Sequence, residues 1–175
     1  LEPLQPLLAQ QHLFRMARIF GTGGAAKAVA IALHDQGFTC VIIARDLDKA
    51  RALREAFEPD DRLIAPIDIF AEPTDFPFDD RQGILDVVVN TTSLGMKGQP
   101  PLQLDFSHVP PNAVIYDIVY APLETPLLAE ARARGLRTVD GLRMLVGQAA
   151  VAFEHFFGVP APRGADDDLR RQLLA

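Results

Sequence analysis

Short apolar runs alternate with longer stretches of helical periodicity along most of the chain. The short runs are typical of β-strands, and we place strands at residues 18–20, 39–44, 62–65, 85–90, 113–120 and 137–139. The run at 39–44, TCVIIA, is apolar throughout and rich in β-branched residues. Such a run is expected of a strand that is buried on both faces of a parallel sheet.

The segments between these runs have the spacing and end signals of helices. We predict helices at 1–11, 25–36, 49–57, 126 to near 135, 142–157 and 166–174. Asp48 can cap the third of these, and Thr125 followed by Pro126 is a strong helix start. The proline-rich stretches at 66–77 and 100–111 are expected to be loops between strands.

Strands that alternate with helices of about 10 to 15 residues form βαβ units, which assemble into a parallel sheet. The predicted fold is therefore α/β: a doubly wound parallel sheet of about six strands, that is, a Rossmann-type NAD(P)-binding domain. We assign residues 18–158 to this dinucleotide-binding domain. Residues 1–17 form a linking helix and the approach to the domain, and residues 159–175 form a C-terminal tail and helix.

Composition and charge narrow the possible functions. Seventeen basic against 23 acidic residues give a net charge of −6, which argues against nucleic acid as a partner. The single cysteine, Cys40, excludes an intrachain disulfide and fits a reducing cytoplasm. The four histidines are scattered, without metal-ligand spacing, and no apolar run reaches the roughly 18 residues of a membrane span. We expect a cytoplasmic, metal-free domain with a small-molecule partner. Because the chain opens at Leu1 without Met, we also expect a fragment or a processed chain.

A glycine-rich turn follows the first predicted strand. Gly21, Gly23 and Ala26 have the G-x-G-x-x-A spacing of a dinucleotide-binding turn that opens a helix. Gly21 permits the tight turn, Gly23 lets the backbone approach a pyrophosphate, and Ala26 allows close packing of helix on strand. The alternative is a tight strand-to-helix turn that binds nothing, since any such turn favours glycine.

The end of the second strand carries the signals that distinguish NADP from NAD. An Arg there accommodates the 2′-phosphate of NADP, whereas an acidic residue favours the ribose of NAD, and the sequence offers both in Arg45 and Asp46. A contact of Arg45 with the phosphate contributes roughly 1.5–3 kcal/mol. Asp46 at about 6 Å costs about 2–3 kcal/mol at an effective dielectric constant near 20. NADP is expected if Asp46 points away, with Lys49 as a second cation. A solvated turn that contacts nothing is the alternative.

Two further groups of polar residues lie where ligands of α/β sheets bind. Asn90, Thr91 and Thr92 follow the fourth strand at the carboxyl edge of the sheet, although Asn and Thr are also common turn formers. Gln148 lies on an otherwise apolar helix face and needs a hydrogen-bond partner, which is either a structural group or a ligand.

The order of five motifs resembles the cofactor-binding half of the shikimate dehydrogenase family. The motifs are GTGGAAKA from Gly21, the Arg after the second strand, NTTSLGM from Asn90, DIVYAPLETPLL from Asp117 and DGLRMLVGQAAVAF from Asp140. The resemblance covers residues 18–158. It implies the NADPH-dependent, reversible reduction of 3-dehydroshikimate to shikimate in aromatic amino-acid (chorismate) biosynthesis.

The resemblance also assigns roles to individual residues. The pyrophosphate would contact Gly21, Thr22, Gly23, Gly24 and Ala25, and the adenosine phosphate would lie among Ala44, Arg45, Asp46 and Lys49. Ile118 and Gly141 would lie against the nicotinamide, Asn90, Thr91 and Thr92 would complete the cofactor site, and Tyr120 and Gln148 would reach the substrate.

Two departures from the family pattern keep alternatives open. The Asn and Thr that usually flank the family's Arg are Ala44 and Asp46 here, which leaves an NAD-dependent quinate/shikimate dehydrogenase possible. The family carries its catalytic Lys and Asp in an N-terminal domain, and none of Lys27, Lys49 and Lys97 matches that Lys. We therefore expect no catalytic residue in this chain. A non-catalytic NAD(P)-binding sensor or repressor domain is the alternative from another class, and the oligomeric state stays open.

Overall fold

The computed structural model describes residues 2–57, 60, 63–75 and 83–174, and its centre is a parallel sheet. The six strands are β1 (Phe14–Phe20), β2 (Thr39–Ala44), β3 (Ile64–Pro66), β4 (Ile84–Asn90), β5 (Val114–Asp117) and β6 (Arg137–Val139). They lie in the order β3-β2-β1-β4-β5-β6, and every neighbouring pair is parallel. This order reverses direction between β1 and β4, and it confirms the predicted doubly wound, Rossmann-type sheet.

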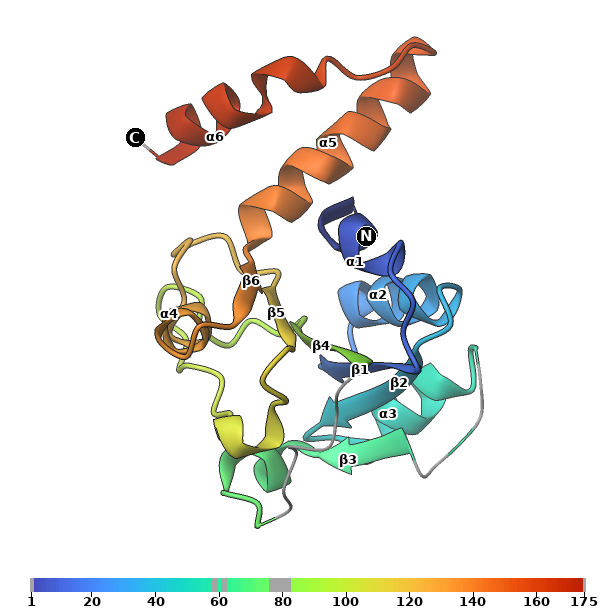
Figure 1. Ribbon diagram of the computed structural model, residues 1–175, viewed down its shortest axis with the longest axis vertical. Coiled ribbons are helices and arrows are strands. Elements are labelled where there is room, and N and C mark those ends of the chain that lie inside the picture. Colours follow the sequence, from blue (N-terminus) through green and yellow to red (C-terminus); the bar gives the residue numbers. More distant parts are fainter. Residues whose placement is uncertain (1, 58–59, 61–62, 76–82, 175) are drawn as a thin grey trace.

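Helices cover both faces of the sheet (Figure 1). The α-helices are α1 (Gln5–Leu8), α2 (Gly24–His34), α3 (Leu47–Arg54), α4 (Pro126–Ala133), α5 (Gly141–Phe157) and α6 (Asp166–Leu174). Short 3-10 helices lie at Glu2–Leu4, Ile67–Ala71, Phe106–His108 and Arg163–Ala165. One apolar core joins α1, α2 and α3 to one face of the sheet, and a second core joins α4 and the 106–108 turn to the other face.

The first strand begins at Phe14 rather than at the predicted residue 18. Arg15 and Arg18 interrupt its apolar pattern, yet Arg18 is buried in the sheet. Its guanidinium pairs with the buried carboxylate of Asp86 on the neighbouring strand β4, at 3.0 Å between Nη1 and Oδ2. A charged residue can lie inside a sheet when such a partner compensates its lost hydration.

Other predicted boundaries also moved. Asp46, not Asp48, caps α3, because the Asp46 carboxylate accepts from the Lys49 N–H at 3.1 Å. The fifth strand ends at Asp117 instead of continuing to residue 120, since the Asp117 carboxylate bends the chain by accepting from the Val119 N–H. The first helix ends at Leu8. Within the stretch predicted as loop at 66–77, residues 67–71 form a 3-10 helix, and residues 76–77 lie outside the described part of the chain, as does residue 62 of the predicted third strand.

The C-terminal helices extend beyond the two packed layers. Figure 1 shows α5 running away from the sheet before the chain turns back into α6. The far end of α5 leaves large apolar side chains in solvent: Phe156 is 85% exposed and Phe157 is 66% exposed. These aromatic residues have no core to join within the described residues.

Candidate functional site

The turn after β1 fits only glycine at its first position. Gly21 has φ +116°, and its N–H donates to Ile43 O at 2.9 Å. A Cβ at this position would lie 2.7 Å from Thr91 Oγ1. Thr91 is held there because its N–H and its hydroxyl both donate to Phe20 O, at 2.9 and 2.6 Å. The loop after β4 therefore lies directly against the glycine turn.

The start of α2 is open to solvent. Gly23 is the N-cap residue and provides no side-chain cap, and Gly23, Gly24 and Ala25 are all exposed. A Cβ built at Gly23 or Gly24 would meet no atom within 4 Å. No side chain caps the first N–H groups of this helix of 11 residues, which lie at the positive end of its dipole. Such a helix start suits a phosphate. Ala26 is fully buried, which agrees with its predicted packing role.

In the charged turn after β2, Arg45 and Asp46 have different surroundings. The Asp46 carboxylate caps α3 and also pairs with Lys49 Nζ at 3.2 Å. Hydrogen bonds from Lys49 lower the pKa of Asp46, which therefore stays ionised. Arg45 is exposed, and within the described chain it has no hydrogen-bond or ion-pair partner. Ala44 is buried at the strand end. The arginine is thus available to a ligand, while the two neighbouring charges compensate each other.

Asn90 uses its whole side chain to shape the loop after β4. Its Oδ1 accepts from the N–H and the hydroxyl of Thr92, at 3.0 and 2.7 Å. Its Nδ2 donates to Leu94 O and to Asp117 Oδ1, both at 3.0 Å. Asn90 is fully buried. These contacts show how the predicted residue positions Thr91 and Thr92 beside the glycine turn.

Asp117 was not predicted as a site residue, yet it joins the ends of two strands. Its carboxylate accepts from Asn90 Nδ2, from the Val119 N–H at 3.0 Å and from Thr125 Oγ1 at 2.7 Å. Burial raises the pKa of Asp117, and these hydrogen bonds only partly oppose the effect. A carboxylate at the end of an apolar strand was the signal in the sequence, since a buried Asp needs partners from other loops.

The residues expected at the nicotinamide lie together. A Cβ at Gly141 would lie 2.4 Å from Ile118 O and 2.5 Å from Val119 O, so the start of α5 is seated on the chain just beyond β5. Gln148 lies about two turns further along α5 and is exposed. Tyr120 is also exposed.

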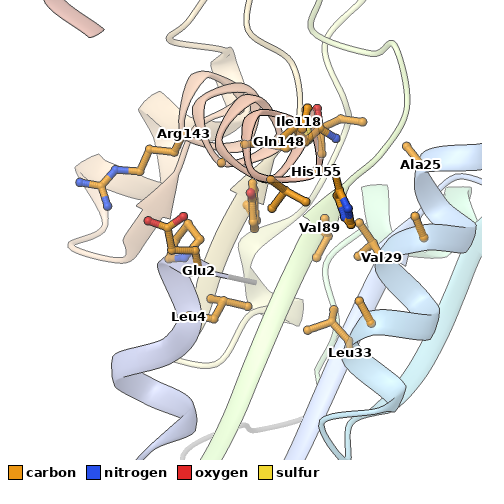
Figure 2. Close-up of a pocket in the computed structure, with 18 residues that line it drawn as sticks. Glu2, Leu4, Ala25, Val29, Leu33, Val89, Ile118, Arg143, Gln148 and His155 are labelled. Atoms are coloured by element: carbon orange, nitrogen blue, oxygen red, sulfur yellow. The ribbon is translucent and has the colours of Figure 1, made fainter. Parts of the chain in front are cut away.

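A cavity of about 650 Å³ opens between α2 and α5 (Figure 2). Ala25, Ile118 and Gln148 line it, which brings three predicted residues from different elements to one space, whereas Tyr120 does not line it. The lining also includes residues that sequence reasoning missed: Val89, Tyr116, Arg143 and His155. Burial, followed by the charges of Asp140 and Glu2, raises the pKa of Tyr116 to about 12. No local signal marks these residues, because their convergence depends on how α5 packs over the sheet.

Two negative findings concern the described residues alone. None of the helices there combines the length and the apolar character needed to cross a membrane. In the same part of the chain, no three side chains among His, Cys, Asp and Glu gather closely enough to hold a metal ion.

Comparison with known proteins identifies the family. The family model described as "Shikimate 5'-dehydrogenase C-terminal domain" matches residues 141–166. A shikimate dehydrogenase (NADP(+)) of Sphingopyxis alaskensis is 48% identical over 158 residues, which are 90% of this chain and 53% of that protein.

Solved structures agree in fold. Quinate dehydrogenase from Corynebacterium glutamicum in complex with NAD superposes with a TM-score of 0.72 at 28% identity, over 99% of this chain and 59% of that one. Shikimate 5-dehydrogenase from Thermus thermophilus, in complex with NADP(H) and shikimate, gives a TM-score of 0.68 at 30% identity, over 97% and 59%. The chain spans about half the length of the curated relatives it matches, and over that span it belongs to the shikimate dehydrogenase family.

Proposed function

We propose that this chain is the cofactor-binding part of an NADP-dependent oxidoreductase that interconverts 3-dehydroshikimate and shikimate. The observation that carries the proposal is the combination of an uncapped, open helix start at Gly23 with an unpaired Arg45 at the end of the adjacent strand. The first suits a pyrophosphate and the second suits a 2′-phosphate. The relatives named as NADP-dependent shikimate dehydrogenases support the same assignment.

The proposal gives each predicted residue a task. The pyrophosphate is held by the glycine turn, that is, by Gly21, Thr22, Gly23, Gly24 and Ala25. The adenosine phosphate lies in the turn after β2, among Ala44, Arg45, Asp46 and Lys49. Arg45 supplies the charge, and the other three residues shape the turn. Asn90, Thr91 and Thr92 form the loop that supports the glycine turn. Ile118 and Gly141 lie against the nicotinamide, and Tyr120 and Gln148 face the substrate. When bound, the cofactor supplies or accepts the hydride.

Removal of Arg45 is expected to narrow the preference for NADP(H) over NAD(H). Arg45→Ala should lower the ratio of the two affinities by about 10- to 100-fold, since a charge-assisted contact with the 2′-phosphate is lost. Titration of NADPH and NADH fluorescence measures both dissociation constants. Arg51→Ala, in the following helix α3 and paired with Asp48, is the control and should leave the ratio unchanged. Equal affinities for the two cofactors in the unaltered chain would contradict the proposal.

A side chain at Gly23 is expected to block the pyrophosphate without harming the fold. Gly23→Val should abolish dinucleotide binding because the isopropyl group fills the space that the backbone leaves open. The φ of −79° is an ordinary value for valine, so thermal unfolding should stay cooperative. Ala52→Val, on the exposed surface of α3, introduces the same isopropyl side chain away from the glycine turn and should bind normally. Normal binding by Gly23→Val would show that the pyrophosphate lies elsewhere.

An NAD-dependent quinate/shikimate dehydrogenase is the second candidate. The quinate dehydrogenase that binds NAD has the same fold, and Asp46 occupies a position where an acidic residue favours NAD. The two candidates differ in the role of Asp46. Asp46→Asn retains a good helix cap and removes the charge. It should improve NADPH binding if Asp46 merely caps α3, and it should weaken NADH binding if Asp46 holds the ribose.

A further inference from the structure

The N-terminal end of α5 depends on a buried carboxylate. Asp140 lies between β6 and α5, and its Oδ1 accepts from the Arg143 N–H at 3.1 Å as the helix cap. The side chain is buried, so its charge has lost most of its hydration. A buried carboxylate persists as a charge only when a cation and hydrogen bonds compensate that loss.

The compensating cation comes from the last helix. Arg170 of α6 donates through Nη1 to Asp140 Oδ1 at 2.9 Å and through Nη2 to Asp140 Oδ2 at 2.5 Å, which is a two-pronged pairing. Burial raises the pKa of Asp140, but the hydrogen bonds from Arg170 and Arg143 outweigh it and hold the pKa below its usual value. This pair is well shielded from solvent, since the Arg170 side chain is 26% exposed and the Asp140 side chain is 7% exposed.

A second contact ties the same segment to the N-terminal end of the chain. Arg163 donates to both carboxylate oxygens of Glu2, at 2.9 and 2.7 Å, and also to Asp166. This pair is far more exposed, at 40% and 59%, so it adds little free energy by itself. It does hold the 163–165 turn close to the start of the chain. Helix α6 follows this turn and leads back to α5.

Through Asp140, Arg170 contacts the start of α5, which belongs to the proposed site. Gly141 follows Asp140 directly and leaves no room for a Cβ against Ile118 and Val119. Ile118 and Gln148 line the cavity, and so does Tyr116, whose pKa the charge of Asp140 helps to raise. A shift of the Asp140 carboxylate therefore reaches the residues expected at the nicotinamide.

We propose that Arg170 is a positioning residue: through its two hydrogen bonds to Asp140, the C-terminal helix α6 fixes the start of α5 and thereby sets the affinity for the cofactor. The affinity part rests on the proposed function. The matched family model ends at residue 166, before Arg170, so the family match does not assign this role.

The test compares NADPH dissociation constants and backbone hydrogen exchange in the purified chain. Arg170→Met removes both donors and keeps the length of the side chain, and it should raise the NADPH dissociation constant about tenfold, as expected for the loss of a charge-assisted hydrogen bond. Arg170→Lys restores one donor and should recover part of the affinity. Arg171→Met, on the exposed side of the same helix, is the control and should behave like the unaltered chain.

A double variant tests whether Arg170 acts through Asp140. If it does, Arg170→Met should have little further effect in a chain that already carries Asp140→Asn. Full additivity of the two changes would overturn the proposal. Hydrogen exchange at residues 141–145, measured without cofactor, should be faster in Arg170→Met. Unchanged exchange and unchanged NADPH affinity in that variant would also overturn it. If the unaltered chain bound no NADPH, the proposed function would fail, while the exchange measurement would still decide the role of Arg170.

Discussion

The purified 175-residue chain is expected to bind NADPH but to leave shikimate unoxidised in the presence of NADP⁺. Oxidation of a secondary alcohol needs a group that takes up the hydroxyl proton, and such a group contributes about 10²- to 10⁴-fold to the rate. It also needs the substrate held against the nicotinamide, which is worth about 7–11 kcal/mol. Tyr120 and Gln148 are the residues that the proposal places on the substrate side, and neither a neutral phenol nor a side-chain amide is a good proton acceptor.

Two hydrogen bonds in an open cleft give weak binding as well. At about 1 kcal/mol each, they would hold shikimate no more tightly than about millimolar. None of the three lysines lines the cavity described between α2 and α5.

Absorbance at 340 nm with shikimate and NADP⁺ measures turnover, and NADPH fluorescence in the same preparation serves as the binding control. Turnover at the rate of a full-length family member would contradict the expectation and would make His155, the imidazole in the cavity wall, the first candidate for the proton acceptor.

Gly141→Ala is expected to damage both stability and cofactor binding. The added Cβ would lie 2.4 Å from Ile118 O and 2.5 Å from Val119 O, and backbone oxygens cannot rotate away as a flexible side chain would. The start of α5 must therefore move. Overpacking of this kind costs about 3 kcal/mol, which lowers Tm by about 10 °C in a chain of this size. Because Gly141 borders Ile118, NADPH affinity should fall at least about tenfold.

Gly147→Ala provides the matched control on the same helix. Its Cβ would meet only Glu2 Oε2, at an ordinary contact distance of 3.5 Å. Alanine in a helix interior is about 0.8–1 kcal/mol more favourable than glycine, so Tm should rise by about 2–4 °C. Thermal unfolding and NADPH titration of both variants distinguish the effect of the steric clash at residue 141 from the effect of helix propensity. Equal Tm values for the two variants would mean that α5 is not seated on residues 118–119.

The sequence predicted the fold because its signals were local. The glycine turn, the apolar strand at 39–44 and the cap formed by Thr125 each depend on residues that are close together in the chain, and each was confirmed. The cap of α3 was predicted at Asp48, but Asp46, two positions earlier in the chain, forms it. Local patterns cannot make that choice.

What the sequence could not reveal depends on long-range contacts. Phe14 was left outside the first strand because Arg15 and Arg18 interrupt the apolar pattern, and the buried partner of Arg18, Asp86, lies 68 residues away. Asp117 ended its strand early because hydrogen bonds from Asn90 and Thr125 stabilise a bend at that point. The cavity wall combines α2, α5, two strands and the 3-10 turn at the start of the chain, so Tyr116 and His155 could not be recognised before those elements were placed.

The buried Arg18–Asp86 pair has a consequence for how the chain finds its strand alignment. Arg18 lies opposite Val88 in the β1–β4 ladder, and Asp86 lies two residues back on the same face, opposite Met16. A slip of one residue would carry one of the two charges into the opposite, apolar core. A slip of two that moves Arg18 from Val88 to Asn90 would leave both charges buried and apart. Each of these misaligned forms carries an uncompensated charge, so the pair disfavours them, a task that interchangeable valines and isoleucines cannot perform.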